Sequence, residues 1–189
     1  MKTIVLASGN KDKLREIREM LPEFNVVSCK EMGFNEEIEE NGKTFYENAL
    51  IKAKTVAEAL SLPALADDSG ICVDVLNGEP GIYSARYAGD GNDTHNNQKL
   101  LKVLEGEGNR KANFTCCMVY YKPNGEISTF TGKTEGEILH APEGENGFGY
   151  DPIFFSYDLN KCLGVATDKE KNTISHRARA LKGIKEFIK

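Results

Sequence analysis

The sequence predicts an α/β fold with a mixed β-sheet, and two observations support this expectation. Short apolar, β-branched runs alternate with segments of helical spacing over the first half of the chain. Two later apolar runs, residues 114–121 and 127–134, are joined by a Pro-Asn-Gly turn that is typical of a hairpin. Alternating strands and helices favour a sheet covered by helices, and a hairpin adds antiparallel strands. We expect any second lobe to come from the hairpin region.

The first elements follow from hydrophobic periodicity. Residues 3–8 form an apolar, β-branched run that predicts a strand. Residues 11–21 place apolar side chains at positions 14, 17, 20 and 21, which is helical spacing, and Pro22 stops the helix. A strand over 24–28, an irregular acidic segment over 31–42 and a helix over 44–60 follow. Thr44 and Glu47 have the spacing of a capping box at the start of this last helix.

The later elements are less regular. An apolar strand over 63–66 runs into Asp67-Asp68-Ser69-Gly70 and continues as strand over 71–76. The other expected elements are a Gly- and Pro-rich loop over 78–91, a helix over 94–104, a flexible glycine loop over 144–149 and a last helix over 175–188.

Length and composition are those of an ordinary globular protein. The 189 residues fit one domain, 1–189, and are enough to bury a full core. No run approaches the roughly 20 apolar residues that span a bilayer, and the first eight residues are too short for a secretory signal. The net charge of −5 argues against bulk attraction to nucleic acid or to an anionic membrane. We therefore expect a cytoplasmic protein with no nucleic-acid or membrane partner, in which specific lysines and arginines can still bind a small anion.

Cysteines and histidines restrict the kind of metal site. The five cysteines, at positions 29, 72, 116, 117 and 162, are odd in number and contain no Cys-x-x-Cys pair. This pattern indicates reduced residues, mostly in the core. The three histidines are dispersed, which argues against a zinc site. A metal would be held by carboxylates, which favour Mg²⁺ or Mn²⁺.

The segment 8–13, SGNKDK, has the features of an anion site. A strand ends, a glycine turn follows, and a helix begins with Lys11 and Lys13 in its first turn. The backbone N–H groups and the dipole of a helix start bind anions. Lysines are poorly placed there unless an anion is bound, although a simple cap with solvated lysines is the alternative. The pattern is not a P-loop, because the Gly-x-x-x-x-Gly-Lys-Ser/Thr spacing is absent.

Carboxylates occur in two places that suit a metal or a base. Asp67 and Asp68 end an apolar strand, and neighbouring side chains of an extended segment point to opposite faces. One could therefore bind metal while the other braces the loop. A plain turn is the alternative, because Asp-Ser-Gly is common in turns. The acidic stretch 36–42 is more often a solvated surface than a site.

Two motifs near the C-terminus could contact a nucleotide. Residues 148–152, FGYDP, place aromatic rings on a glycine-rich segment, and such rings can stack on a base with a gain of ~1–3 kcal/mol. Core packing is the alternative. Ser175 is a natural N-cap, and His176 and Arg177 behind it could donate to a keto oxygen or a phosphate. A surface helix start is the alternative here.

The order of these motifs is more specific than any one of them. SGNKDK, EENG…ENALIKA, ADDSG, GIYSARYAG, FGYDPIF and SHR follow one another from Ser8 to Arg177. In this order they resemble the inosine triphosphate pyrophosphatases, the Ham1-like enzymes that remove deaminated purine nucleotides. The resemblance covers essentially the whole chain. It implies a long central mixed sheet flanked by helices, two lobes with an intervening cleft, and a homodimer.

The resemblance also implies roles for individual residues. Asp68 is implied as the catalytic carboxylate, with Glu39 as its partner at Mg²⁺, one or more ions per subunit. Phe148 is implied as the ring that stacks on the base, and Asp151 as a polar contact to the base. The implied triphosphate ligands are Ser8, Asn10, Lys13 and Lys52. The full set of implied substrate-binding residues is Ser8, Gly9, Asn10, Lys11, Asp12, Lys13, Lys52, Ser69, Phe148, Gly149, Tyr150, Asp151, Lys171, His176 and Arg177.

The implied activity is Mg²⁺-dependent hydrolysis of ITP, dITP and XTP to the monophosphate and pyrophosphate, which keeps these nucleotides out of DNA and RNA. Mg²⁺ and several lysines would offset the roughly four negative charges of a triphosphate. Water would attack the α-phosphorus in line, and Asp68 would act as general base, as metal ligand, or as both. His176 and Arg177 are donors, so they accept a purine with a 6-keto group and disfavour adenine.

Three other functions compete with this one. A Maf-like nucleotide pyrophosphatase would act on pyrimidine or modified nucleotides, so a substrate panel distinguishes it. A non-catalytic nucleotide-binding protein needs phosphate and base contacts but not the carboxylates at 39 and 68, so their presence argues against it. A nucleic-acid-binding module conflicts with the charge of −5 and with the lack of a basic stripe.

Overall fold

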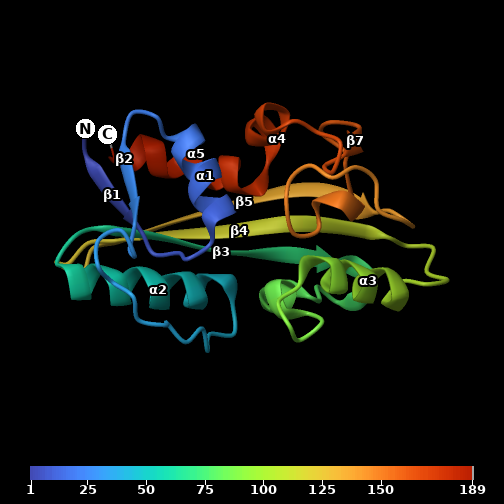
Figure 1. Cartoon of the computed structure of the whole chain (residues 1–189), viewed down its shortest axis with the longest axis horizontal. Helices are drawn as coiled ribbons and strands as arrows, with labels where there is room; N and C mark the ends of the chain where they lie inside the picture. Colours follow the sequence, from blue (N-terminus) through green and yellow to red (C-terminus); the bar gives the residue numbers. More distant parts are fainter. Residues whose placement is uncertain (189) are drawn as a thin grey trace. The chain divides into compact units, whose positions relative to one another are not determined.

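A seven-stranded sheet with strand order β2-β1-β3-β4-β5-β6-β7 organises the computed structural model, which describes residues 1–188 (Figure 1). The strands are β1 (Thr3–Leu6), β2 (Asn25–Ser28), β3 (Ala64–Val73), β4 (Lys111–Tyr121), β5 (Ile127–Ile138), β6 (Phe154–Ser156) and β7 (Lys161–Cys162). β1 pairs in parallel with β2 and β3, whereas β6 pairs antiparallel with β5 and β7. The predicted α/β fold with a mixed sheet is confirmed.

Five α-helices accompany these strands within residues 1–188. They are α1 (Lys11–Met20), α2 (Phe45–Leu60), α3 (Asp93–Val103), α4 (Asp168–Ile174) and α5 (His176–Ile188). Short 3₁₀ helices cover Asp74–Leu76, Gly81–Arg86 and Asp151–Ile153. None of the described helices has both the length and the apolar character needed to cross a membrane.

The chain forms two compact units. Unit 1 contains Met1–Asp68, Cys116–Gly132 and the described chain from Ala178 onward; unit 2 contains Ser69–Thr115 and Lys133–Arg177. The boundaries fall inside β3, β4, β5 and α5. The expectation that a second lobe comes from the hairpin region is wrong. The strands β4 and β5 are longer than expected, and the turn between them belongs to unit 1.

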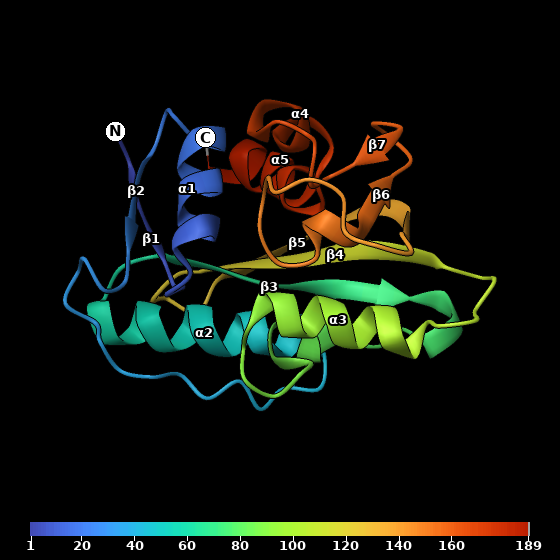
Figure 2. The same cartoon turned by 45° about the vertical axis from the view of Figure 1, so that its right-hand side comes forward.

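Unit 1 has an apolar layer on each face of its strands. Ile4 and Leu6 of β1 pack with Ile17 of α1 and with buried residues of α5. Val5 points the other way and packs with α2 through side chains such as Ala53. This alternation is the period of two that a strand imposes on its side chains. Figures 1 and 2 show α1 and α5 on one face of these strands and α2 on the other.

Unit 2 has a separate core. Ile71 of β3 and Phe114 of β4 pack with Leu100 of α3 and with Phe154 of β6. The rings of Phe114 and Phe154 lie 4.6 Å apart between centroids. This core supports the segments that carry the candidate residues of unit 2.

β3 is one continuous strand through residues 67–70, so the alternative of a plain turn at these residues is wrong. Asp67 pairs with Lys13 of α1, and Asp68 accepts a hydrogen bond from Asn48 of α2. Because both carboxylates have partners beside the strand, the chain can remain extended at these residues. Gly70 allows a close approach of the following segment, because a Cβ there would lie 2.2 Å from the Gly81 carbonyl oxygen. Residues 74–76, also predicted as strand, form a 3₁₀ helix instead.

The helix ends show two further differences. α4 was not predicted, although Thr167 and Glu170 form a complete capping box at its start. Ser175 is extended between α4 and α5. At α2, Thr44 accepts the Glu47 N–H at 3.1 Å as expected, but the Glu47 carboxylate accepts the N–H of Lys43 rather than that of Thr44. The predicted capping box is therefore only half formed.

Candidate functional site

Two neighbouring carboxylates of β3 face opposite sides of unit 1. The Asp67 side chain is fully buried and its Oδ2 lies 2.9 Å from Nζ of Lys13, in the first turn of α1. Asp68 points to α2, where Asn48 Nδ2 donates to its Oδ2 at 3.0 Å and Lys52 Nζ lies 3.9 Å from its Oδ1. Asn48 and Lys52 are four residues apart, so they share one face of the helix. The opposite orientation of the two aspartates, predicted from strand geometry, is confirmed.

Lys52 is shared between two carboxylates. Its Nζ lies 2.8 Å from Oε2 of Glu40, in addition to its approach to Asp68. Burial alone would lower the pKa of Lys52, but nearby carboxylates outweigh that effect and raise it. Burial also raises the pKa of Asp68, although Lys52 and the Asn48 amide oppose the shift. We call Asp67, Asp68, Glu40, Lys13 and Lys52 the carboxylate cluster.

The loop before α1 is held by Asn10. Asn10 Oδ1 accepts the N–H groups of Asp12 at 2.9 Å and Lys13 at 3.0 Å, and the Asn10 N–H donates to Ser8 Oγ at 3.2 Å. Two of the N–H groups at this helix start are therefore already satisfied. Anion binding here would depend on lysine side chains and on the remaining N–H groups.

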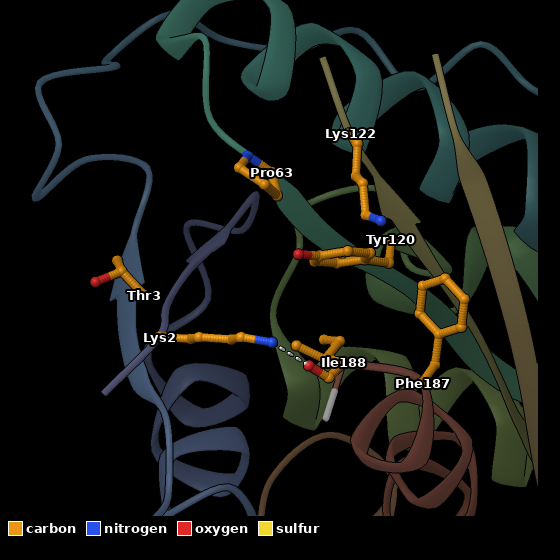
Figure 3. Close-up of a pocket in the computed structure, with 7 residues that line it drawn as sticks. All are labelled: Lys2, Thr3, Pro63, Tyr120, Lys122, Phe187 and Ile188. Carbon is orange, nitrogen blue, oxygen red and sulfur yellow. Dashed lines mark hydrogen bonds between the residues drawn. The ribbon is translucent and has the colours of Figure 1, made fainter. Parts of the chain in front are cut away.

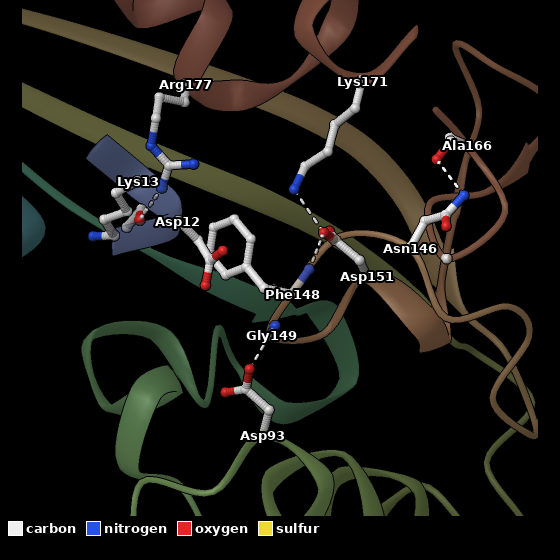
Figure 4. A network of polar contacts seen from close by, with 12 residues as sticks. Asp12, Lys13, Asp93, Asn146, Phe148, Gly149, Asp151, Ala166, Lys171 and Arg177 are labelled. Atoms are coloured by element: carbon white, nitrogen blue, oxygen red, sulfur yellow. Dashed lines mark hydrogen bonds and ion pairs between the residues drawn. The ribbon is translucent and has the colours of Figure 1, made fainter. Parts of the chain in front are cut away.

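Unit 2 holds a second set of predicted residues around Asp151 (Figure 4). Asp151 Oδ2 accepts from Lys171 Nζ at 2.6 Å and from the Phe148 N–H at 2.9 Å. The side chains of Asp151 and Lys171 are 3% and 4% exposed, so this ion pair is buried. Lys171 Nζ lies 4.4 Å from the centre of the half-buried Phe148 ring, and Arg177 Cζ lies 5.9 Å from it. Asp151 thus fixes both a buried cation and the backbone that carries the predicted stacking ring.

The start of α5 supplies two more of the predicted residues, His176 and Arg177. His176 stacks on Phe114 with ring centroids 4.9 Å apart and planes at 13°. Arg177 Nη2 donates to Ser69 Oγ at 3.2 Å. Both His176 and Arg177 are buried, which contradicts the alternative of a solvated surface helix start.

Comparison with known proteins establishes the relationship of this chain. A model of the Ham1 family matches residues 4–187. The chain belongs to the Ham1 family. The family resemblance inferred from the motif order is therefore confirmed.

Full-length relatives of this Ham1-family chain are named dITP/XTP pyrophosphatase. The protein from Clostridium perfringens is 47% identical, with 100% of this chain and 98% of that protein covered. The protein from Bacillus subtilis is 46% identical with the same coverage. The solved structure of the Staphylococcus aureus Ham1 protein matches with a TM-score of 0.90 and 42% identity, over 99% of this chain and 98% of that chain. A HAM1 protein from Coxiella burnetii matches with a TM-score of 0.91 and 42% identity, over 100% and 98%.

Some predicted residues of this Ham1-family chain have other contacts. The Tyr150 hydroxyl donates to the Ser84 carbonyl at 2.7 Å and is buried, which gives it a structural role in unit 2. Glu39 is exposed, and its neighbour Glu40 is the residue that reaches Lys52. The assignment of Glu39 to a metal stays a prediction. The exposed carboxylate of Asp12 lies 3.5 Å from Nη1 of Arg15, and the Asp12 N–H donates to Asn10 Oδ1.

Residues that the sequence did not single out hold the Phe148 segment. Asp93 Oδ2 accepts the Gly149 N–H at 2.8 Å, and Asn97 Nδ2 donates to the Gly149 carbonyl at 3.1 Å. Figure 4 shows the contact of Asp93 with Gly149. Asp93 and Asn97 lie on α3, four positions apart, so one helix face binds both sides of Gly149. Asn48 was missed in the same way. The only signal for these residues is a polar i,i+4 pair on a helix, which is also typical of an ordinary surface.

A pocket of about 430 Å³ also lies in unit 1, lined by Lys2, Thr3, Pro63, Tyr120, Lys122, Phe187 and Ile188 (Figure 3). Its two lysines are engaged, since Lys2 donates to the Ile188 carbonyl at 2.8 Å and Lys122 pairs with Glu126 at 2.9 Å. Thr3 and Pro63 stand at the amino ends of β1 and β3, whereas ligands of open α/β sheets bind at the carboxyl ends. This pocket is therefore not the candidate site.

Two glycines of the Phe148 segment give a matched pair of variants. Gly147 and Gly149 have φ of +74° and +62°, so alanine costs about 1–2 kcal/mol at either position. A Cβ at Gly147 would also lie 2.1 Å from Asp151 Oδ2, whereas a Cβ at Gly149 would meet nothing within 4 Å. We expect Gly147→Ala to lower the free energy of unfolding by about 1–3 kcal/mol more than Gly149→Ala. Denaturant unfolding of both variants measures this difference, and equal losses would contradict the close packing of Gly147 on Asp151.

Proposed function

We propose that this Ham1-family protein hydrolyses deaminated purine nucleoside triphosphates, namely ITP, dITP and XTP, to the monophosphate and pyrophosphate. The observation that carries the proposal is the buried Asp68 carboxylate with Lys52 at 3.9 Å and Asn48 at 3.0 Å, next in sequence to Ser69, which contacts Arg177. The dITP/XTP pyrophosphatase name shared by relatives of 46–47% identity over the whole chain supports it. In this proposal both units form one functional domain, 1–189.

The phosphate chain is bound through unit 1. Ser8, Asn10 and Lys13 lie on the loop and first turn that follow the carboxyl end of β1, where ligands of open α/β sheets bind. Lys52 adds a buried cation beside Asp68. Lysines near the phosphates offset the negative charge of the bound triphosphate.

Mg²⁺ is the proposed cofactor, and the donors of the carboxylate cluster fit it. Asp68 and Glu40 are oxygen donors that approach the same lysine, and Mg²⁺ is commonly bound by one or two carboxylates together with substrate phosphates. Within residues 1–188 there is no group of three or more His, Cys, Asp or Glu side chains arranged around a metal position. When bound, Mg²⁺ would polarise the phosphoryl oxygens and acidify a water molecule. Glu39 is proposed as a further ligand.

Asp68 is the proposed general base. It accepts a proton from the attacking water, whose oxygen bonds to the α-phosphorus while the bond from that phosphorus to the bridging oxygen breaks. The electron pair leaves with pyrophosphate. Burial raises the pKa of Asp68, which strengthens it as a base, and the Asn48 amide fixes its orientation. Asp68 also serves as a metal ligand in this proposal.

The base is selected through unit 2. Phe148 provides a ring for stacking, held by the Asp151 carboxylate and by α3. His176 and Arg177 donate hydrogen bonds to the 6-keto oxygen of hypoxanthine or xanthine. The 6-amino group of adenine is itself a donor, so it cannot accept these hydrogen bonds. Such mismatches in a site built for hydrogen bonding can exclude the wrong substrate by ~10⁴-fold. We also propose a cytoplasmic homodimer with no nucleic-acid or membrane partner.

A substrate panel tests the proposed function. The protein is incubated with ITP, XTP, dGTP, ATP and CTP, with and without Mg²⁺, and pyrophosphate and orthophosphate are measured separately. We expect pyrophosphate from ITP and XTP only, and only with Mg²⁺. Equal turnover of ATP would contradict the base selection. Preferred cleavage of CTP would indicate a Maf-like specificity, and nucleotide binding without turnover would indicate a non-catalytic protein.

A further inference from the structure

Lys30 lies beside the loop that follows β1. β1 and β2 are parallel with Leu6 opposite Ser28, and the Cys29 N–H donates to the Leu6 carbonyl at 2.9 Å. This register places the residues after β2 alongside the residues after β1. Both Cε and Nζ of Lys30 lie 3.6 Å from the position that a Cβ on Gly9 would occupy. The Lys30 ammonium therefore lies over the backbone of the Ser8–Gly9–Asn10 turn.

The backbone of Lys30 is fixed by a hydrogen-bonded turn. The Ser28 N–H donates to Glu31 Oε2 at 2.6 Å, the Glu31 N–H donates to Ser28 Oγ at 3.2 Å, and the Gly33 N–H donates to the Lys30 carbonyl at 3.0 Å. The same Glu31 carboxylate receives Arg18 Nη2 at 2.9 and 3.1 Å. Glu31 is thus saturated by Ser28 and Arg18. Across residues 1–188, no ion pair or hydrogen bond engages the Lys30 ammonium, which is exposed.

The carboxylate cluster of unit 1 has no net positive charge with which to bind a triphosphate. The carboxylate cluster holds three carboxylates, Asp67, Asp68 and Glu40, against two lysines, Lys13 and Lys52. Those two lysines are already compensated within the protein. A triphosphate brings about four negative charges of its own, which a cluster with no excess positive charge cannot offset. Lys30, which follows β2 and lies beside the loop after β1, has no carboxylate partner within residues 1–188 and adds its positive charge to that of the proposed Mg²⁺.

We propose that Lys30 is a further phosphate-binding residue, which holds the pyrophosphate portion of the substrate over the Ser8–Gly9–Asn10 turn. This inference rests on the proposed function for the identity of the phosphate chain. Lys30 binds the same oxygens in substrate and in the leaving pyrophosphate, so its contribution is uniform binding. Its loss therefore raises KM and leaves kcat nearly unchanged.

Three variants test the role of Lys30. Lys30→Ala removes the cation, Lys30→Arg keeps it, and Lys54→Ala removes an exposed lysine of α2 that pairs with Glu58 at 4.0 Å. KM and kcat are measured with XTP, and pyrophosphate binding is measured by calorimetry. We expect Lys30→Ala to raise KM and weaken pyrophosphate binding in parallel, each by about 10- to 100-fold, because hydrogen bonds to charged groups have this strength. Lys30→Arg should retain most of the binding, and Lys54→Ala should match the unchanged protein.

The outcomes separate this inference from the proposed function. A KM and a pyrophosphate affinity within about twofold of the unchanged protein for Lys30→Ala would overturn the role of Lys30, as would an equal loss in Lys54→Ala. If the unchanged protein released no pyrophosphate from XTP, the proposed function would fail instead. In that case calorimetry with inorganic triphosphate still compares Lys30→Ala with the unchanged protein, and equal affinities or no binding by either would overturn the role of Lys30.

Discussion

Replacing Asp68 with asparagine is expected to lower kcat by at least about 100-fold, because a positioned general base contributes 10²–10⁴-fold. Asparagine keeps the shape of the side chain and an oxygen that can accept the Asn48 amide, now 3.0 Å away. Lys52 keeps its 2.8 Å contact with Glu40. The fold should therefore survive while the proton acceptor is lost. The rate of pyrophosphate release from XTP measures the effect.

The stability of the Asp68→Asn variant provides the necessary check. Burial raises the pKa of Asp68 in the folded protein, so its ionised form is disfavoured there and the amide removes that cost. Thermal unfolding should show no loss of stability. Glu58→Gln, which changes an exposed carboxylate of α2, should retain the full rate. A turnover rate of Asp68→Asn close to that of Glu58→Gln would contradict the role of Asp68 as general base.

Replacing Asp151 with alanine is expected to lower the free energy of unfolding by about 3–5 kcal/mol. The Lys171–Asp151 pair is buried, with Nζ and Oδ2 2.6 Å apart, and the alanine variant leaves the Lys171 ammonium without this carboxylate. The same substitution removes the acceptor of the Phe148 N–H. Since a domain is commonly stable by only ~5–15 kcal/mol, this is a large fraction of the total. Urea-induced unfolding gives the measurement.

Two comparisons show whether the loss comes from the buried charge. The double variant Asp151→Ala with Lys171→Met removes both charges and should recover part of the lost stability, because an apolar pair replaces the ion pair. Glu126→Ala breaks the exposed Lys122–Glu126 pair, with side chains 35% and 45% exposed, and should cost no more than about 1 kcal/mol. Equal, small losses for Asp151→Ala and Glu126→Ala would contradict the buried pair as the support of the Phe148 segment.

The sequence predicted those elements whose signal is local. The apolar, β-branched run of β1, the helical spacing of α1 and the capping residues and Ala- and Leu-rich content of α2 were enough to place these elements. The alternation of strand side chains also predicted that Asp67 and Asp68 face opposite sides. The continuity of β3 was not predictable in this way, because the partners that keep its aspartates in a strand lie on α1 and α2. α4 was missed although the Thr167 and Glu170 pattern was present.

The candidate site likewise contains residues that lie in local sequence motifs and residues that only the fold brings together. Residues within distinctive motifs, such as Asp68, Phe148 and Arg177, are candidates that the sequence alone suggests. Asp93 and Asn97 were not, because a polar pair on a helix is typical of a solvated face, and only the folded chain brings the pair to Gly149. Lys30 was missed for a similar reason. Its position beside Gly9 follows from the register of β1 and β2, which the sequence does not state.

Attack of water on the α-phosphorus is tested most directly by hydrolysis of XTP in water enriched in oxygen-18. After a single turnover the monophosphate and the pyrophosphate are separated, and the oxygen-18 content of each is measured by mass spectrometry. Proton transfer to Asp68 and departure of pyrophosphate predict one heavy oxygen in the monophosphate and none in the pyrophosphate. A heavy oxygen in the pyrophosphate would place the attack on the β-phosphorus, and release of labelled orthophosphate would place it on the γ-phosphorus; either result would contradict the proposed reaction.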